Sequence, residues 1–167
     1  MFNNVYKNKK ILITGHTGFK GSWLSLWLQR LKAKEIVGIS LSNKKKYLNY
    51  NNIKSNILIK EYFFNINNFI KLNDVVKKTQ PDFIFHLAAQ PLVNNAFTNP
   101  IETFKTNILG TANILESLKS LKKKCACILI TSDKCYRNLE KKVKYKETDL
   151  LAGKDPYSAS KSSAEIL

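Results

Sequence analysis

Arginine, glycine, cysteine and acidic residues are all scarce in this sequence. The chain carries 28 lysines and arginines against 12 acidic residues, which gives a formal net charge of +16. Only Arg30 and Arg137 are arginines. Because bidentate recognition of phosphates and bases favours arginine, we expect no nucleic-acid partner and interpret the lysine excess as a solvated surface. Together with abundant asparagine and isoleucine, it is typical of an A+T-rich genome.

The few cysteines and the lack of long apolar runs exclude further classes of protein. Cys125, Cys127 and Cys135 are an odd number without zinc-type spacing, so we expect free thiols in a reducing cytoplasm and no metal site. No run reaches the roughly 18 apolar residues of a membrane-spanning helix. The start, residues 1–7, lacks the apolar core of a signal peptide. We therefore expect a cytoplasmic protein with no membrane partner.

Hydrophobic periodicity predicts strands that alternate with helices. Strands are predicted at 11–14, 35–40, 61–64 (or, less favoured, 57–59), 82–87 and 127–131, and helices at 19–31, 68–79, 99–121 and from Asp155 onward. Residues 43–56 are expected to form a loop or a short helix. This alternation predicts a parallel sheet with right-handed crossovers. The fold class is therefore α/β, with a Rossmann-type doubly wound sheet in one domain over residues 1–167.

Two of the predicted helices carry more detailed expectations. In helix 19–31, Phe19, Trp23, Trp27 and Leu31 recur at steps of four. With Leu24 and Leu28 beside them, they form one wide apolar stripe, which in an amphipathic helix faces the core. Helix 99–121 begins with Asn-Pro-Ile-Glu. In this sequence the asparagine is expected to cap the helix, the proline suits the first helical position, and the glutamate completes a capping box.

The glycines that are present concentrate after the first predicted strand. Gly15, Gly18 and Gly21 are three of the six glycines in the chain, and they connect a strand to a helix. In that context small residues let the backbone approach a pyrophosphate, and the helix N-terminus supplies N–H groups. The loop therefore predicts a dinucleotide site. His16 and Lys20 are expected either to contact phosphate or to be solvated.

The end of the second predicted strand, where NAD and NADP are normally distinguished, lacks a carboxylate. Its sequence from Ser40 to Lys46 ends in three lysines. These lysines suit either the 2′-phosphate of NADP or a solvated loop, so this segment leaves the choice of dinucleotide open.

Two residues near the end of the chain predict proton transfer. Tyr157 and Lys161 are four residues apart and so share one face of a helix. A nearby ammonium favours the phenolate, which allows the tyrosine to act as a general base below its free pKa of about 10. Ser132, Asp133 and Lys134 follow the fifth predicted strand. Ligands of parallel sheets bind at the carboxyl ends of strands, where these residues are expected to meet the helix of Tyr157.

Taken together, the glycine loop with Ser132, Tyr157 and Lys161 resembles the extended short-chain dehydrogenase/reductase family of nucleotide-sugar enzymes. Within it, three segments resemble the CDP-glucose 4,6-dehydratases. They are Gly15–Leu28 (GHTGFKGSWLSLWL), His86–Val93 (HLAAQPLV) and Thr131–Tyr136 (TSDKCY). The resemblance implies NAD as cofactor, CDP-glucose as the nucleotide-sugar substrate, CDP-4-keto-6-deoxyglucose as product in lipopolysaccharide (O-antigen) biosynthesis, and a homodimer for the full-length protein.

The same resemblance implies a role for each matching residue. Ser132 would assist the sugar 4-hydroxyl, Tyr157 would remove its proton, and Lys161 would support Tyr157. Lys134, where related dehydratases have glutamate, would take the C5 proton. Asp133 would protonate the departing C6 hydroxyl while hydride passes to NAD and back. The cofactor would be bound by Gly15, Thr17, Gly18, Phe19, Gly21, Asn65, Ile66, Leu87, Ala88, Ala89, Asn107, Tyr157 and Lys161.

Two departures from the family limit what the resemblance implies. Asn65 stands where the family usually has an aspartate near the adenine. The family also continues beyond the tyrosine–lysine helix into a substrate-binding part. We therefore expect an incomplete NAD-binding domain that is inactive by itself. Two alternatives remain open, namely another nucleotide-sugar epimerase or dehydratase, and a non-catalytic dinucleotide-binding remnant.

Overall fold

The computed structural model describes residues 2–42, 48–140 and 144–167 of the chain. These residues fall into two compact units. The first comprises Met1–Ala88 and Asn113–Leu129, and the second comprises Ala89–Ala112 and Ile130–Leu167. The single domain predicted over residues 1–167 stays a prediction. None of the helices in these described ranges is long and apolar enough to cross a membrane.

The first unit holds all five strands of the sheet. In chain order it contains η1 (Phe2–Asn4), β1 (Lys10–Thr14), α1 (Phe19–Arg30), β2 (Glu35–Ser40), α2 (Leu48–Ile53), η2 (Lys54–Asn56), β3 (Lys60–Phe63), α3 (Phe69–Thr79), β4 (Phe83–His86), most of α6 (Gly110–Ser117), η4 (Leu118–Ser120) and β5 (Ala126–Leu129). The third strand therefore lies close to the favoured prediction of 61–64 and not at 57–59.

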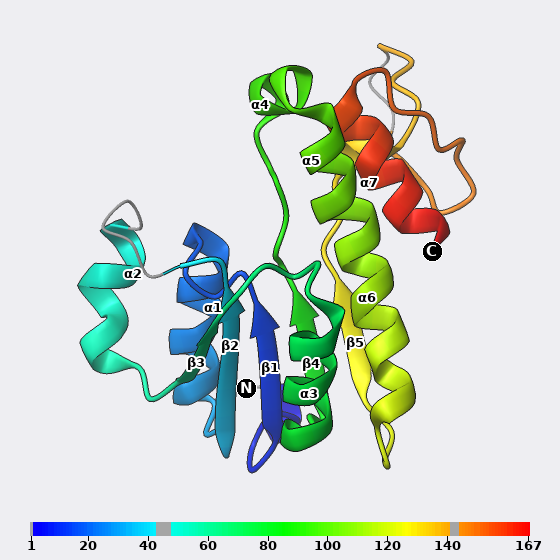
Figure 1. Cartoon of the computed structure of the whole chain (residues 1–167). Coiled ribbons are helices and arrows are strands. Elements are labelled where there is room, and N and C mark those ends of the chain that lie inside the picture. Colours follow the sequence, from blue (N-terminus) through cyan, green and yellow to red (C-terminus); the bar gives the residue numbers. More distant parts are fainter. Residues whose placement is uncertain (1, 43–47, 141–143) are drawn as a thin grey trace. The chain divides into compact units, whose positions relative to one another are not determined.

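The strands run in the order β3-β2-β1-β4-β5, with β1 in the middle (Figure 1). All four neighbouring pairs are parallel. Thr14, the last residue of β1, is level with Ile39 of β2 and His86 of β4. The carboxyl ends of these three strands therefore lie together at one edge, where the glycine loop begins. The predicted Rossmann-type parallel sheet is confirmed.

Alternation along β1 divides the core of this unit into two clusters, one on each face of the sheet. Leu12 packs in a cluster with Leu72 and Val76 of α3. Ile11 and Ile13 point to the other face and pack in a cluster with Leu28 of α1. Helices thus cover both faces of the sheet, which is the doubly wound arrangement that the alternating sequence predicts.

The wide apolar stripe predicted for helix α1 is only partly buried, because Leu28 and Leu24 pack in the core while the aromatic residues do not. Phe19, Trp23 and Trp27 are 72%, 49% and 45% exposed. The buried residues of α1 are instead Gly21, Ser22, Ser25 and Leu28. Small side chains let the helix axis approach the sheet closely, so they occupy the inner face, and the aromatic rings lie outside.

The second unit is helical. It contains α4 (Val93–Thr98), α5 (Pro100–Phe104), the π-helical turn η3 (Lys105–Leu109), the start of α6, η5 (Asp133–Cys135) and α7 (Pro156–Ile166). The helix predicted over 99–121 is thus α5, η3, α6 and η4 in succession. Pro100 takes the first helical position as predicted, but the side chain of Asn99 makes no capping bond. The backbone N–H of Asn99 donates to Asn95 O at the end of α4, so it is not available to Glu102, and the predicted capping box does not form.

Helix α7 begins as its sequence predicts. Asp155 is the N-cap, and its carboxylate accepts the backbone N–H of Ser158 at 3.0 Å. Pro156 stands at the first helical position. This start fixes the turn on which Tyr157 lies and places Lys161 one turn further along.

Candidate dinucleotide-binding loop and proton-transfer residues

At Gly15 and Gly21 the glycine loop leaves no room for a side chain. Gly15 has a φ of +76°, in the left-handed region that favours glycine, and a Cβ there would lie 2.9 Å from Ala88 N. A Cβ on Gly21 would lie 2.2 Å from Gly15 O. Gly18 is the N-cap of α1 and provides no side-chain cap. The first N–H groups of α1 therefore border a side-chain-free cradle, which suits a pyrophosphate.

Two other predicted cofactor residues on this loop have contrasting surroundings. Thr17 is buried, and both its backbone N–H and its hydroxyl donate to Ser40 Oγ, at 3.3 and 3.1 Å. Its side chain is thus turned into the protein, and its contribution to the loop is structural. Phe19, in contrast, is exposed at the first turn of α1.

Leu87 and Ala88, which follow β4, are hydrogen-bonded to the end of β1 next to the glycine loop, within the first unit. Thr14 Oγ1 bonds His86 Nδ1 at 2.7 Å and accepts the backbone N–H of Ala88 at 3.1 Å. Leu87 N–H donates to Thr14 O at 3.1 Å. These bonds hold the Leu87–Ala88 backbone beside Gly15. Ala89, the next predicted cofactor residue, begins the second unit.

The predicted adenine-side residues lie after β3. Asn65 is exposed, and its Oδ1 accepts the N–H of Asn67 at 2.9 Å. The side chain of Ile66 is 5% exposed and packs in the core, while its carbonyl accepts from Asn113. Among the described residues, Asn67 Oδ1 is buried without a hydrogen-bond partner. Asn67 is a polar residue at this place that sequence reasoning missed.

The end of β2 offers little for the recognition of a ribose. Ser40 is buried, and its hydroxyl already bonds both Thr17 and His16. Lysines 44–46, on which the choice between a 2′-phosphate and a solvated loop depends, lie outside the described residues.

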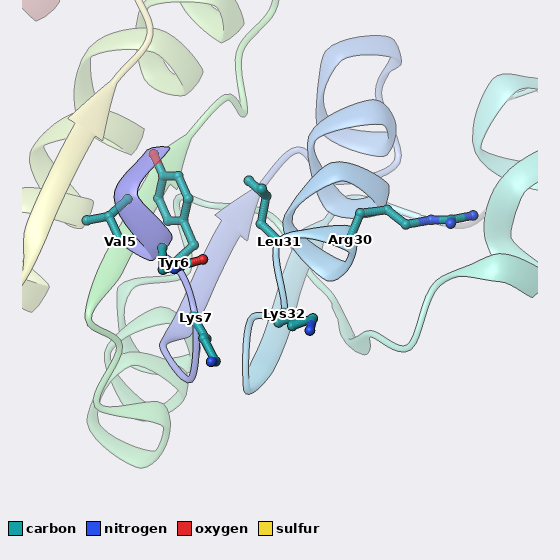
Figure 2. A pocket seen from close by; sticks show the side chains of 7 residues that line it. Val5, Tyr6, Lys7, Arg30, Leu31 and Lys32 are labelled. Carbon is teal, nitrogen blue, oxygen red and sulfur yellow. The ribbon is translucent and has the colours of Figure 1, made fainter. Parts of the chain in front are cut away.

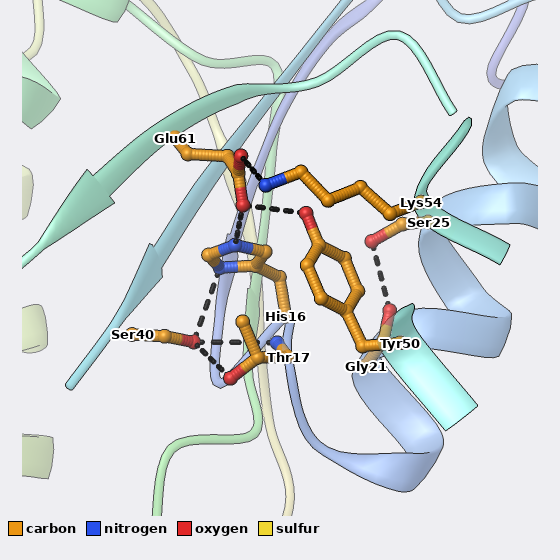
Figure 3. A network of polar contacts seen from close by, with 8 residues as sticks. All are labelled: His16, Thr17, Gly21, Ser25, Ser40, Tyr50, Lys54 and Glu61. Carbon is orange, nitrogen blue, oxygen red and sulfur yellow. Dashed lines mark hydrogen bonds and ion pairs between the residues drawn. The ribbon is translucent and has the colours of Figure 1, made fainter. Parts of the chain in front are cut away.

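His16 is fully buried, with both ring nitrogens bonded (Figure 3). It is therefore neither solvated nor free to contact a phosphate.

In the second unit, η5 presents three of the predicted catalytic residues. Ser132 is its N-cap, and its Oγ accepts the N–H of Lys134 at 3.2 Å. The Ser132 hydroxyl donates to Asp133 Oδ1 at 3.1 Å. Asp133 and Lys134 are exposed and, with Tyr136 and Asp155, line a hollow of 410 Å³. The ion pairs of the described structure do not include one between Asp133 and Lys134.

Helix α7 packs on η5 and the residues just before it, within the same unit. Ser162 donates to Cys135 O at 2.7 Å, and Thr131 bonds Glu165. Lys161 is 7% exposed, and its Nζ donates to Ile130 O at 2.9 Å. Tyr157 is half-buried on the first turn of α7. The second unit thus brings Ser132, Asp133 and Lys134 to the helix that carries Tyr157 and Lys161.

Asn107 connects three parts of the second unit. It is 1% exposed and lies in the π-helical turn η3. Its Oδ1 accepts Gln90 N–H at 2.8 Å, and its Nδ2 donates to Gln90 O at 3.1 Å and to Ser160 Oγ at 2.9 Å. Single π turns occur often at functional sites. Sequence reasoning missed Gln90 and Ser160, because they come close to Asn107 only in the folded chain and are 17 and 53 positions away from it in the sequence.

Cys125 and Cys127 and a further hollow lie outside these sites. All three cysteines are free, and burial, followed by the neighbouring Cys125, raises the pKa of Cys127 to about 11. A hollow of 230 Å³ lies where η1 meets the C-terminal end of α1. Figure 2 shows that the charged ends of Lys7 and Arg30 point away from each other there. They do not converge on a common ligand.

Comparison with known proteins agrees with this geometry. A family profile described as GDP-mannose 4,6 dehydratase matches residues 12–167. CDP-glucose 4,6-dehydratase of Salmonella typhimurium is 41% identical over 164 residues, which are 98% of this chain and 45% of that protein. The UDP-glucose 4-epimerase of Thermotoga maritima, solved with UDP-glucose, is 27% identical with a TM-score of 0.77, over 94% of this chain and 49% of the epimerase.

A dTDP-glucose 4,6-dehydratase of Streptomyces venezuelae, solved with NAD bound, shares the fold with a TM-score of 0.82 at 21% identity, over 94% of this chain and 49% of that one. The chain thus spans about half the length of these relatives. Fold and site together define a member of the nucleotide-sugar dehydratase and epimerase superfamily. More narrowly, the chain belongs to the GDP-mannose 4,6-dehydratase family.

Proposed function

We propose that this chain is the NAD-binding and proton-transferring portion of a CDP-glucose 4,6-dehydratase. The observation that carries the proposal is the arrangement in the second unit, where Asp133 and Lys134 lie on η5 against the helix of Tyr157 and Lys161. An epimerase needs no acid and base for elimination. Identity of 41% to the Salmonella CDP-glucose 4,6-dehydratase supports the choice of substrate.

The cofactor-binding part of the proposal depends on the glycine cradle. The first N–H groups of α1 and the side-chain-free surface of Gly15 and Gly18 fit a pyrophosphate. At Gly15 and Gly21 the absence of a side chain is enforced by the contacts that a Cβ would make. When bound, the nicotinamide would supply the hydride acceptor for oxidation at C4 of the sugar and the hydride donor for reduction at C6. NAD in the Streptomyces dehydratase of the same fold supports its identity.

The proton transfers are assigned to residues of the second unit. The Tyr157 phenolate takes the proton of the 4-hydroxyl, which Ser132 orients through a hydrogen bond. Lys134, in its neutral form, then removes the proton at C5, and Asp133, in its protonated form, gives a proton to the departing C6 hydroxyl. Water leaves, and a C5–C6 double bond forms. Lys161 lies one turn from Tyr157, where its charge favours the phenolate.

Cofactor binding is tested first on the full chain. Calorimetry should show binding of NADH by the parent and its loss in Gly18→Val, whose side chain would occupy the pyrophosphate approach. Thermal melts of both proteins check that the variant is folded. Equal affinity of the two proteins would refute the role of the loop.

The chemistry is tested after the chain is fused in cis to the C-terminal portion of the Salmonella typhimurium CDP-glucose 4,6-dehydratase. We expect the fusion to convert CDP-glucose to the 4-keto-6-deoxy product, and the 167-residue chain by itself to be inactive. In the fusion, Tyr157→Phe should abolish turnover. Lys134→Ala should abolish product formation and the exchange of the C5 proton with solvent. Full turnover by the Lys134→Ala fusion would contradict the assignment of this base.

A further inference from the structure

A largely buried polar network joins the glycine loop to β2, β3 and the α2–η2 segment in the first unit. Figure 3 shows its members: His16 and Thr17 from the loop, Ser40 from β2, Tyr50 from α2, Lys54 from η2 and Glu61 from β3. His16 and Tyr50 are fully buried. None of these side chains has a place in the proposed chemistry. Their hydrogen bonds nevertheless end on a backbone N–H of the loop itself.

The direction of each bond in the network follows from the groups present. His16 Nε2 lies 3.1 Å from Glu61 Oε1. A carboxylate only accepts hydrogen bonds, so Nε2 carries the proton. Nδ1 then carries a lone pair, and it accepts a hydrogen bond from the Ser40 hydroxyl at 3.1 Å. Because the Ser40 hydroxyl donates its hydrogen bond to His16, its oxygen is free to accept hydrogen bonds from both donors of Thr17, at 3.3 and 3.1 Å.

Glu61 is held in place by donors on three sides. Besides His16, the hydroxyl of Tyr50 donates to Oε1 at 2.5 Å and Lys54 Nζ pairs with Oε2 at 3.0 Å. Burial raises the pKa of this carboxyl, but the hydrogen bonds from Tyr50, His16 and Lys54 outweigh it, so its pKa is lowered. Glu61 is therefore ionised around neutral pH and keeps the proton of His16 on Nε2.

The imidazole itself occupies a space built for it. A Cβ on Gly38 of β2 would lie 2.5 Å from His16 Cγ, so only glycine leaves room for the ring. The charged or titratable groups that face it in the described structure are Glu61 from β3, Tyr50 from α2 and Lys54 from η2. Burial lowers the pKa of His16, and the charge of Lys54 lowers it further. Glu61 and the backbone carbonyl of Ile39 oppose this only in part. The ring is therefore neutral at pH 7.

We propose that His16 is a positioning residue for the dinucleotide loop. Its neutral ring fixes the Ser40 hydroxyl as a double acceptor for Thr17, and this holds the backbone between Gly15 and Gly18 in its binding shape. The inference rests on the proposed function, because it concerns the same loop. It differs from a phosphate-contacting histidine, since both ring nitrogens bond within the protein.

The network makes the loop sensitive to protonation of His16. A protonated ring has an N–H at Nδ1, which must then donate to Ser40 Oγ. A hydroxyl oxygen has two lone pairs, and both already accept from Thr17. One of the Thr17 bonds must therefore be released. We expect NADH affinity to fall as the pH decreases through the pKa of His16 in the folded protein, which lies below the ordinary histidine value of 6.5.

A matched pair of variants separates the two ring nitrogens. His16→Asn places an amide oxygen near the position of Nδ1 and keeps an acceptor for Ser40, whereas His16→Gln reaches Glu61 but leaves the Ser40 hydroxyl without its acceptor. On the full chain, we expect His16→Asn to bind NADH within about twofold of the parent and without the acid decline. We expect His16→Gln to bind about fivefold to tenfold more weakly at pH 7, the effect of one hydrogen bond.

Two further measurements test the role of His16. One of them needs no bound cofactor, and thermal melts show whether each variant is folded. The chain has two histidines, so nitrogen-15 NMR of the ligand-free protein can assign His16, and we expect a neutral ring protonated on Nε2 at pH 7. Glu61→Gln removes the charge that favours imidazolium, so the acid decline should move to lower pH. Thermal melts identify any variant that fails to fold.

The outcomes separate this inference from the proposed function. A charged ring or a proton on Nδ1 at pH 7 would overturn the inference, as would parent-like affinity in both His16 variants at every pH while Gly18→Val loses binding. In these cases the dinucleotide loop stands without the positioning role. Absence of NADH binding by the parent, or equal binding by Gly18→Val, would instead overturn both.

Discussion

The glycine loop of the first unit and the η5–α7 region of the second carry the two halves of the proposed chemistry, and they differ in how far the chain itself encloses them. Around the loop, Thr17, His16 and Ser40 are buried and bonded to each other. In η5, Asp133 and Lys134 are exposed. The loop obtains its shape from its own surroundings. The described residues do not enclose Asp133 and Lys134 in the same way.

This difference predicts where substitutions act. Around the loop, a change alters shape and therefore binding. In η5, a change alters chemistry and leaves stability almost untouched. Asn107 and Lys161 of the second unit differ from Asp133 and Lys134, because both are buried and bonded to backbone atoms.

The largest effect is expected from a methyl group on Gly21. A Cβ there would lie 2.2 Å from Gly15 O and 2.8 Å from His16 Cα, and neither backbone atom can yield without a change in loop shape. We expect Gly21→Ala to lower NADH affinity by more than about 1000-fold. Gly18→Ala is the matched control, because its Cβ would lie 3.2 Å from Gly15 O, and it should lose less than about tenfold. Calorimetry measures both, and equal losses would show that space at Gly21 does not set the loop.

Asn107 gives the next effect, on stability in the second unit. Asn107→Ala removes three hydrogen bonds to Gln90 and Ser160 and leaves buried polar groups unsatisfied. We expect the free energy of unfolding to fall by about 2–3 kcal/mol. Asn94→Ala, at an exposed position of α4, should change it by less than about 0.5 kcal/mol. Urea denaturation compares the two. Equal small effects would mean that the η3 turn does not depend on Asn107.

Two lysines sharpen the comparison within the proposed catalytic residues. Lys161→Met removes the bond from Nζ to Ile130 O in a buried place, and should cost about 1–3 kcal/mol of unfolding free energy. Lys134→Met, at an exposed position, should cost less than about 0.5 kcal/mol. Both should abolish turnover in the fusion with the Salmonella C-terminal portion. If Lys161→Met and Lys134→Met gave the same denaturation curve, the bond from Lys161 to Ile130 O would not stabilise the fold.

The fold and the motifs were predictable because their signals are local. The sheet follows from short apolar runs, the helix start at Asp155 and Pro156 from two adjacent residues, and the glycine loop from spacing along seven residues. The surroundings of His16 were not predictable, since its partners Ser40 and Glu61 are 24 and 45 positions away in the chain. The inner face of α1 was predicted only in part: Leu28 is buried as expected, but close packing selected glycine and serine over the larger aromatic residues.

The smallest expected effect concerns acid stability, and it follows from the lowered pKa values of His16 and Glu61. An unfolded chain takes a proton on histidine near pH 6.5, while the folded protein resists it because the ring is buried. The unfolded state then binds more protons, so the free energy of unfolding decreases as the pH falls below that value. Glu61 adds a decrease of the same sign below its ordinary pKa of 4.5. For one proton the slope is at most about 1.4 kcal/mol per pH unit.

His16→Asn should remove the part of this decline between pH 6.5 and the lowered pKa of His16, and leave the part due to Glu61. Glu61→Gln should remove the second part, and it should also lower the pKa of His16 further, because the charge that favours imidazolium is lost. Chemical denaturation at a series of pH values from 7 downward measures both. A decline that is unchanged in His16→Asn would show that the buried ring does not carry the acid sensitivity, and that other groups of the first unit titrate in its place.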